Sequence, residues 1–331
     1  MIDKMARGIA KHPKTVLIVC LILLIPSIIC YLNTFVNYDI LSYLPEDLNS
    51  VQGEHILDKT FNNAASAIVV IENEDQKTAV KLKEEISEID GVSNVMWVDD
   101  IADISIPEDM LPDDLKNVFY SKDGNATLMM VQFTQGGASE STMDAIKSIR
   151  KCMNKNMFMS GVSTIMYDTK ALADAQAPLY VVIAIVLALI VLMFTLKSYV
   201  LPFVLLMALC TAVVYNMGTN IFFGQISYIT QCIAAILQLG VTMDYSVFLM
   251  DRYEEECKHN DDRTMAMASA ISSTFVSLAG SSLTTVFGFL ALCFMSFKLG
   301  LDIGLVMAKG VLLGVITVVT FLPALILLLD D

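Results

Sequence analysis

A carboxylic acid, Asp244, lies inside an apolar stretch that is long enough to cross a membrane, and Tyr245 follows it directly. The stretch covers residues 226–250, and six residues separate Asp244 from the next acid, Asp251, where the sequence turns polar. A charged carboxylate at such depth is costly unless it faces the interior of a helix bundle, so we expect it there. Such a group can take up and release protons as its surroundings change, and the pair is our predicted proton relay.

Two plainer interpretations of this acid stay open, because Asp244 could reach headgroup water or could hydrogen-bond a neighbouring helix. Four polar residues recur every seven positions and form one stripe of the predicted helix: Gln231, Gln238, Tyr245 and Arg252. Asp244 lies about 100° away from that stripe. Gly240, one turn earlier, lacks a side chain and would let another helix approach closely.

Lys309 is a second ionisable residue inside an apolar run. It could extend to the interface, pair with a carboxylate or bind lipid headgroups. Alternation of the helices puts Asp244 and Lys309 in opposite halves of the membrane, so we do not expect them to pair. The fifth run is rich in Ser, Thr and Gly, which suits close packing of helices. Its residues Thr284, Thr285 and Gly288 are predicted to support the relay or the packing.

No other chemistry is indicated by the sequence. The three histidines, His12, His55 and His259, lie outside the apolar runs and form no cluster, so neither a metal site nor a Ser-His-Asp triad is expected. The phosphate-binding pattern Gly-x-x-x-x-Gly-Lys-Ser/Thr does not occur. We therefore expect no cofactor, with a proton gradient as the energy source, and a secondary transporter rather than an enzyme.

The elements that must position these residues are membrane helices. The chain has 331 residues, 55% of them hydrophobic, and a mean hydropathy of +0.62. About 20 apolar residues suffice to cross a bilayer as a helix. Six runs satisfy or approach this length: residues 16–31, 178–196, 201–217, 226–250, 271–297 and 300–329. The fold class predicted is a polytopic α-helical membrane protein with six transmembrane helices.

A polar segment separates the first run from the second. Its pattern predicts strands at residues 67–71, 92–98, 127–133 and 157–160, with helices at 76–89, 107–119 and 141–153. This order matches a split βαβ, ferredoxin-like α+β domain. Residues 37–177 contain 24 acidic and 11 basic residues, which favours an acidic domain in water and not a nucleic-acid partner. The expected domains are residues 1–36, 37–177 and 178–331.

The N-terminus predicts the orientation of the chain. Lys4, Arg7, Lys11 and Lys14 precede the first run, and basic residues beside a membrane helix remain in the cytoplasm. No small-residue cleavage site follows, so the run is expected to be an uncleaved helix. We therefore predict a multi-pass protein of the cell membrane, with a cytoplasmic N-terminus and an extracytoplasmic domain at residues 37–177.

The motif from Gly240 to Glu255, Gly-Val-Thr-Met-Asp-Tyr-Ser-Val-Phe-Leu-Met-Asp-Arg-Tyr-Glu-Glu, resembles the fourth helix of the resistance-nodulation-division (RND) superfamily, and in particular of its MMPL branch. The segment Thr-Thr-Val-Phe-Gly-Phe-Leu-Ala-Leu from Thr284 resembles the fifth helix of that family. Ala-Lys-Gly around Lys309 and Leu-Pro-Ala-Leu at residues 322–325 resemble the sixth. The order of one helix, a domain and five helices also matches.

This resemblance implies proton-driven export of lipids or other hydrophobic compounds, with the outer domain as a porter domain. Transporters of the family have two such halves, and each supplies an Asp-Tyr pair to a central relay. Asp244 and Tyr245 match the pair of the first half. The expected partner is therefore a second RND half, in the same or another chain. The abrupt end of the sequence favours a truncated half over a half-size protein, and a non-transporting membrane scaffold or lipid sensor is the alternative function.

Overall fold

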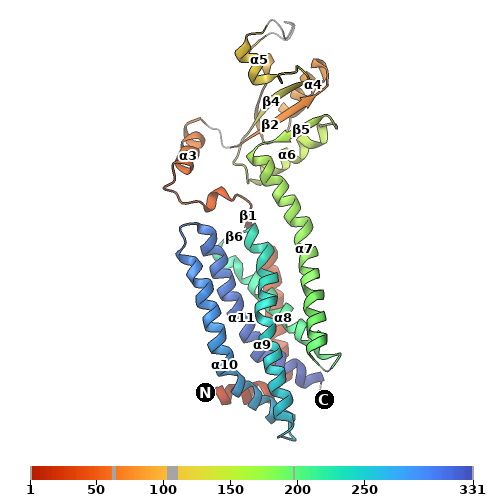
Figure 1. Cartoon of the computed structure of the whole chain (residues 1–331), viewed down its shortest axis with the longest axis vertical. Coiled ribbons are helices and arrows are strands. Elements are labelled where there is room, and N and C mark those ends of the chain that lie inside the picture. The colour runs from red at the N-terminus through yellow and green to blue at the C-terminus, as the bar shows by residue number, and fades with distance from the viewer. Residues whose placement is uncertain (1, 62–64, 103–110, 197, 330–331) are drawn as a thin grey trace. The chain divides into compact units, whose positions relative to one another are not determined.

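The computed structural model describes residues 2–61, 65–102, 111–196 and 198–329. The chain divides into two compact units (Figure 1). One unit comprises Met1–Asn37 and Ala173–Asp331 and is built almost entirely of helices; the other comprises Tyr38–Leu172 and contains a β-sheet. The boundary between the two units lies inside the long helix α7 (Val162–Thr195).

Six helices of the described chain are long and apolar enough to cross a membrane, as the sequence predicts. They are α2 (Pro13–Leu32), α7, α8 (Leu201–Gly218), α9 (Tyr228–Cys257), α10 (Arg263–Ala291) and α11 (Lys298–Leu329). Local signals fix where several of them begin. Pro13 is in the first turn of α2, where the missing N–H costs nothing. Asp262 caps α10 by accepting a hydrogen bond of 2.8 Å from the Thr264 N–H.

Three of the predicted helix boundaries are wrong. Helix α7 begins at Val162 and not at residue 178, because Pro178 is accommodated inside the helix. Helix α9 continues to Cys257, beyond the predicted end at residue 250, and α10 begins at Arg263, before the predicted start at residue 271. Polar residues can extend a helix beyond its apolar run, so hydropathy alone places the end of α9 too early and the starts of α7 and α10 too late.

Helix α11 is the most buried of the six membrane-spanning helices and packs against α2, α8, α9 and α10. Its glycines explain how the neighbours come so close. A β carbon at Gly310 would lie 2.5 Å from the Asn216 side-chain nitrogen of α8, and one at Gly314 would lie 2.4 Å from the Thr242 methyl group of α9. Helix α7, in contrast, buries few of its residues.

The second unit contains a four-stranded antiparallel sheet with the order β3-β4-β2-β5. The strands are β2 (Ser66–Glu72), β3 (Val92–Met96), β4 (Ala126–Phe133) and β5 (Met157–Ser160), close to the predicted positions. Helices α4 (Gln76–Ser87), α5 (Asp113–Phe119) and α6 (Glu140–Cys152) accompany the sheet. Residues 107–110 of the predicted helix at 107–119 lie outside the described residues. Alternate residues of β2, such as Ala67, Val69 and Ile71, are buried in the core.

Several elements were not predicted. The N-terminal residues form a separate helix, α1 (Ile2–Lys11), and α3 covers Asn49–Phe61. Short strands β1 (Phe35–Asn37) and β6 (Gln225–Ser227) pair in parallel within the helical unit. The two three-residue strands are too short to carry a periodicity that can be recognised from one sequence.

Truncation of a core residue in the sheet-containing unit should be measurable with a natural reporter. Ile146 of α6 is fully buried, so Ile146→Ala is expected to lower the free energy of unfolding of this unit by about 2–5 kcal/mol. Trp97 is the sole tryptophan of the chain and is fully buried in the same core, so its fluorescence reports this unfolding. Lys147→Ala, at the exposed neighbouring position, is the control and should leave the urea midpoint unchanged.

An ion-pair cluster makes the same unit sensitive to acid. Burial opposes ionisation of Asp100, but the Lys83 ammonium at 2.7 Å and the Trp97 N–H at 2.8 Å outweigh it and lower the pKa of this carboxyl group. A lowered pKa in the folded state stabilises the fold above about pH 4, the range of an unfolded carboxyl group, and this contribution disappears as the pH falls through the folded value.

We therefore expect Asp100→Asn to destabilise the unit at pH 7 by up to about 1 kcal/mol, since the pair is partly exposed. The difference from the wild type should shrink towards pH 2.5. Urea unfolding followed by Trp97 fluorescence at both pH values tests this, and a difference that is equal at both would contradict it.

Candidate functional site

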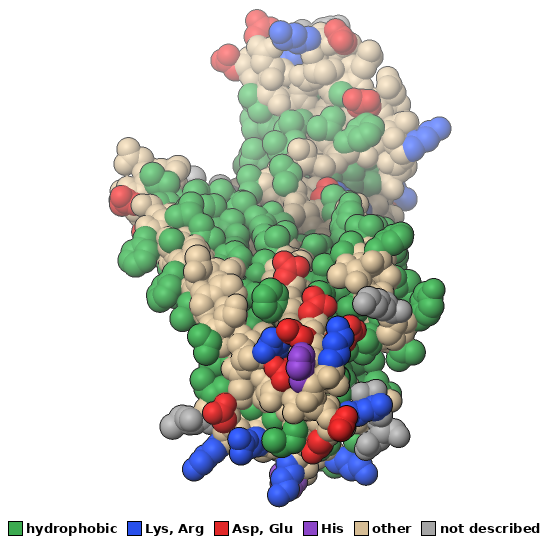
Figure 2. Space-filling model, turned by 60° about the horizontal axis from the view of Figure 1, so that its bottom comes forward, with side chains coloured by type: hydrophobic (Ala, Val, Ile, Leu, Met, Phe, Trp, Pro, Cys, Tyr) green, Lys and Arg blue, Asp and Glu red, His purple; other side chains and the backbone are tan. Residues whose placement is uncertain are grey.

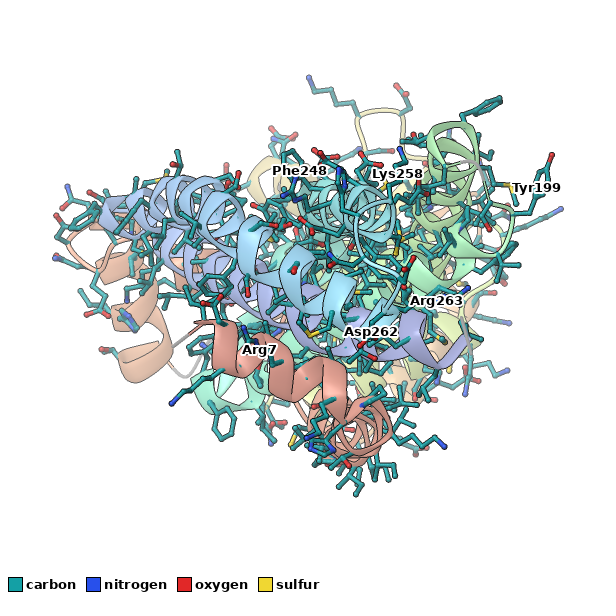
Figure 3. All side chains as sticks on the ribbon, turned by 90° about the horizontal axis from the view of Figure 1, so that it is seen from below. Arg7, Tyr199, Phe248, Lys258, Asp262 and Arg263 are labelled. Carbon is teal, nitrogen blue, oxygen red and sulfur yellow. The ribbon has the colours of Figure 1, made fainter. Side chains whose placement is uncertain are left out.

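Helix α9 has two different faces. Its N-terminus is capped by Ser227, whose hydroxyl accepts a hydrogen bond from the Ile229 N–H at 3.2 Å. The face directed to the other helices is buried and unusually polar: Thr230, Gln238, Thr242 and Ser246 are all fully buried. The opposite face is exposed at helical spacing, at Leu237, Gly240, Asp244 and Phe248. Figure 3 shows Phe248 on the side of the bundle away from α1.

Asp244 therefore lies on the exposed face, whereas its neighbour Tyr245 is buried. The expectation that Asp244 faces the interior of this bundle is wrong for the chain by itself. The reason is the angle between consecutive residues of a helix: Tyr245 shares the buried face with Gln238, and this turns Asp244 outwards by about 100°. The sequence predicted the angle between Asp244 and Tyr245, but it did not predict that the Tyr245 side of the helix would be the buried one.

A groove surrounds Asp244. It has a volume of about 520 Å³ and lies among α7, α9 and α10. Its lining is mainly apolar, with the carboxyl group of Asp244 and a few hydroxyl groups as the polar part: Tyr245 from α9, Thr195 from α7, and Ser277 and Ser281 from α10. A carboxylate among hydroxyl groups in an apolar groove has the groups that proton transfer requires, provided that water or a further chain covers it.

The other predicted supports of the relay do not line this groove. Thr284 and Thr285 lie further along α10, and their hydroxyl groups donate to the carbonyls of Gly280 and Ser281, each at 3.2 Å. At both Gly240 and Gly288 a β carbon would meet nothing within 4 Å in the described part of the chain, apart from the backbone of its own helix. The hydroxyl residues that do reach the groove, Ser277 and Ser281, lie one to two turns before the two threonines and belong to the same small-residue pattern.

Lys309 lies at a different place in the bundle. Its ammonium group donates hydrogen bonds to the Asn216 carbonyl at 2.9 Å and to the Asn220 side-chain oxygen at 2.6 Å. It also lies 4.9 Å from the centre of the Phe223 ring, a cation–π contact. No ion pair joins Lys309 to any carboxylate in the described part of the chain. These partners come from α8 and the turn after it, which the sequence did not indicate.

A buried amide pair lies next to Lys309. The Asn216 amide donates to the Gln238 side-chain oxygen at 2.8 Å, and the Gln238 amide donates to the Gly310 carbonyl at 3.1 Å. Helices α8, α9 and α11 are thereby tied together in the bundle interior. Among the described residues, the Asn216 Oδ1, Ser246 Oγ and Thr274 Oγ1 atoms are buried without a hydrogen-bond partner.

Asp302 is a charged residue of the bundle that the sequence analysis missed. Its carboxylate accepts hydrogen bonds from the Ser227 N–H, at 2.8 Å, and from the Thr230 hydroxyl. It therefore stabilises the N-terminus of α9 from a neighbouring helix, as negative charges do at this end. Its position two turns before Lys309 in an otherwise apolar helix was the available signal.

The architecture, the fourth-helix acid and the polar interior can now be compared with known proteins. The sequence model of the MMPL family matches residues 42–330. The chain belongs to the MMPL family. This confirms the family resemblance that the fourth-, fifth- and sixth-helix motifs indicated, and the chain is a multi-pass membrane protein of this family.

Individual relatives are more distant. Putative membrane protein MJ1562 of Methanocaldococcus jannaschii is 24% identical over 76% of this chain and 70% of its own length. Probable transport protein MmpL12 of Mycobacterium tuberculosis is 24% identical over 68% of this chain and 21% of its own length. The apo-petrobactin exporter of Bacillus anthracis is 24% identical over 86% of this chain and 41% of its own length. This MMPL chain thus matches less than half of the two relatives that are named for transport.

Proposed function

We propose that this MMPL chain is one half of a proton-driven exporter of lipids or other hydrophobic compounds, with Asp244 and Tyr245 as its part of the proton relay. The observation that carries the proposal is the exposed carboxyl group of Asp244 in a groove of membrane-spanning helices. An uncovered carboxylate facing lipid is costly. A second protein surface over the groove removes this cost and creates the enclosed site that a relay requires.

The face around the groove supports pairing with a second MMPL half. Helix α7 exposes a long series of apolar side chains, and the exposed face of α9 adds Leu237 and Phe248. Gly240 is open on the same face as Asp244, so a helix of the second half can approach α9 closely there. Gly240, Thr284, Thr285 and Gly288 are then packing positions of the assembled transporter.

The sheet-containing unit is the proposed extracytoplasmic porter domain. Its sheet order, β3-β4-β2-β5, with α4 and α6 as the connecting helices, supports a ferredoxin-like, split βαβ arrangement. The basic residues before α2 support a cytoplasmic N-terminus in the cell membrane. The name of the Bacillus anthracis relative supports export as the direction of transport.

The experiment that tests the function is flux in proteoliposomes that contain the chain and a second MMPL half, either another copy or a different chain. Efflux of a hydrophobic fluorescent dye should require an imposed pH gradient and should stop when a proton ionophore collapses it. Dye efflux that persists unchanged without the gradient would contradict proton coupling.

The pairing itself can be tested at Gly240. Gly240→Leu should leave the thermal stability of the isolated chain unchanged or raise it slightly, because a β carbon there meets open space and leucine favours the helix over glycine. It should weaken association with the second half at least about tenfold, because a bulky side chain separates the helices. Mass measurement in detergent, with each chain alone and both together, gives the result. Equal association of the variant and the wild type would place the interface elsewhere.

A lipid-sensing function is the second candidate, and one observation favours it. An apolar groove of about 350 Å³ lies among α2, α8 and α11. All its hydroxyl groups donate to backbone carbonyls: Ser27, Tyr215, Thr219, Thr317 and Thr320. Such a surface suits a hydrocarbon chain. If sensing is the function, Asp244→Asn should change partner binding but no dye efflux should depend on a proton gradient.

A further inference from the structure

The N-terminal helix α1 is amphipathic and is held against the bundle by one face. Ala6, Ile9 and Ala10 are buried, and α1 packs chiefly on α10. The remaining face is in solvent and carries Lys4, Arg7 and Lys11. A basic face that points away from the protein next to a membrane-spanning helix is suited to contact anionic lipid headgroups.

The junction between α1 and α2 fixes this position. The backbone leaves helical geometry at His12, and Pro13 starts the membrane-spanning helix α2. Helix α1 therefore ends where α2 begins to cross the membrane. Viewed from below, α1 lies beside α10 and runs across the end of the bundle, not along the bundle axis (Figure 3). Because α2 begins to cross the membrane at this junction, we expect the basic face of α1 at the level of the lipid headgroups.

The segment from Ile2 to Lys14 carries an excess of positive charge. Between Ile2 and Lys14 the chain has four strong bases, Lys4, Arg7, Lys11 and Lys14, and one acid, Asp3. All four basic side chains are exposed, and none forms an ion pair with a described residue. Figure 2 shows Lys and Arg side chains at this end of the helical unit, together with Asp and Glu side chains.

The neighbouring cation of α9 behaves differently. Arg252 contacts Glu255 at 2.6 Å and Glu256 at 2.7 Å and also donates to the Ser273 hydroxyl. The charge of Arg252 is therefore compensated within the protein. Lys4, Arg7, Lys11 and Lys14, in contrast, have no acidic partner among the described residues and stay available for a ligand.

Arg7 also borders a hollow that could accept a headgroup. The hollow has a volume of about 480 Å³ and is lined by α1, by Glu256 and by α10. Ser269 and Ser272 of α10 contribute hydroxyl groups, which suit a phosphate oxygen beside a guanidinium. Two acids also line it: Glu256 is neutralised by Arg252, and Asp3 is a repulsive element.

We propose that α1 is a docking site for anionic phospholipid headgroups, held by Lys4, Arg7, Lys11 and Lys14. Four basic residues directly beside a membrane helix match the charge of an anionic leaflet. Because α1 packs on α10, which forms one wall of the Asp244 groove, a bound lipid also fixes the position of that wall. Binding itself does not depend on the transport function.

The test uses the full chain in detergent, titrated with phosphatidylglycerol or with phosphatidylcholine. Native mass spectrometry counts bound lipids, and the apparent Tm reports stabilisation. Phosphatidylglycerol should bind at least about tenfold more tightly than phosphatidylcholine, and the preference should fall at high salt. Replacing Lys4, Arg7, Lys11 and Lys14 together by Gln should abolish the preference, whereas Asp3→Asn should strengthen binding.

A matched control removes the same charge elsewhere: Lys77, Lys122, Lys147 and Lys155 are exposed in the other unit and are replaced together by Gln. This variant should keep the wild-type preference. The proposal would be overturned if the α1 variant still preferred phosphatidylglycerol, or if the control variant lost this preference to the same extent. If the α1 variant fails to fold, hydrogen exchange of wild-type α1 in nanodiscs decides: phosphatidylglycerol should slow it several-fold relative to phosphatidylcholine, and equal rates would refute docking.

Discussion

Asp244→Asn is expected to reduce proton-driven efflux to background, a loss of at least about 100-fold, in proteoliposomes that contain the complete transporter. Asparagine has nearly the same shape and keeps hydrogen-bonding capacity, but it cannot take up and release a proton. The groove should therefore stay intact while the coupling is lost. Efflux of a hydrophobic fluorescent dye under an imposed pH gradient measures this, at equal protein content in the membrane.

Two further variants separate the relay from a general effect of charge. Asp251→Asn removes an exposed acid from the same helix, two turns further on and outside the groove, and should leave efflux near the wild-type rate. Asp244→Glu keeps a titratable group and should retain part of the activity. Unchanged efflux in Asp244→Asn would eliminate Asp244 as a relay residue, and equal loss in Asp251→Asn would assign the effect to charge alone.

Much of the fold could be predicted because each element carries a strong local pattern. The six spans stand out by length and apolar content, and β4 and β5 lie within one residue of their predicted positions. The family could be recognised because its fourth-, fifth- and sixth-helix motifs survive as contiguous residues. Contiguous signals of this kind need no knowledge of tertiary structure.

The candidate site was only partly predictable, because burial depends on which helix covers which face. The sequence places Asp244 and Tyr245 about 100° apart, and the structure adds that the Tyr245 side is the one facing α10 and α11. The amide pair of Asn216 and Gln238 joins residues 22 positions apart on different helices. Neither amide stands out in its own segment of the sequence, so the pair can be recognised only once the structure places α8 and α9 side by side.

The packing of the buried face of α9 against α11 also sets the position of its exposed face. Gln238 donates to the Gly310 carbonyl, and Thr242 fits over Gly314 one turn later. Asp244 and Tyr245 follow directly after this contact. The depth and rotation of the groove residues are therefore set by an interior contact that includes neither of them, and a change at the contact should disturb both the bundle and the groove.

Gly310→Val is expected to destabilise the helical unit strongly. Even the β carbon would lie 2.5 Å from the Asn216 side-chain nitrogen and 3.1 Å from the Gln238 side-chain oxygen. Neither amide can retreat cheaply, because the two are hydrogen-bonded to each other and the Gln238 amide also donates to the Gly310 carbonyl. Overpacking of this kind costs about 1–3 kcal/mol or more, so we expect the apparent Tm in detergent to fall by about 5–10 °C.

Gly280→Ala is the matched control, since it also adds a side chain to a glycine of a membrane-spanning helix but meets open space. It should leave the Tm unchanged or raise it slightly, because alanine favours helix by about 1 kcal/mol. If Gly310→Val unfolds at the wild-type temperature, the close approach of α8, α9 and α11 is not present in the folded protein. If Gly310→Val is destabilised and Asn216→Ala in the same chain restores part of the Tm, the clash with the Asn216 amide is the cause. The register of α9, which positions Asp244, then depends on Gly310.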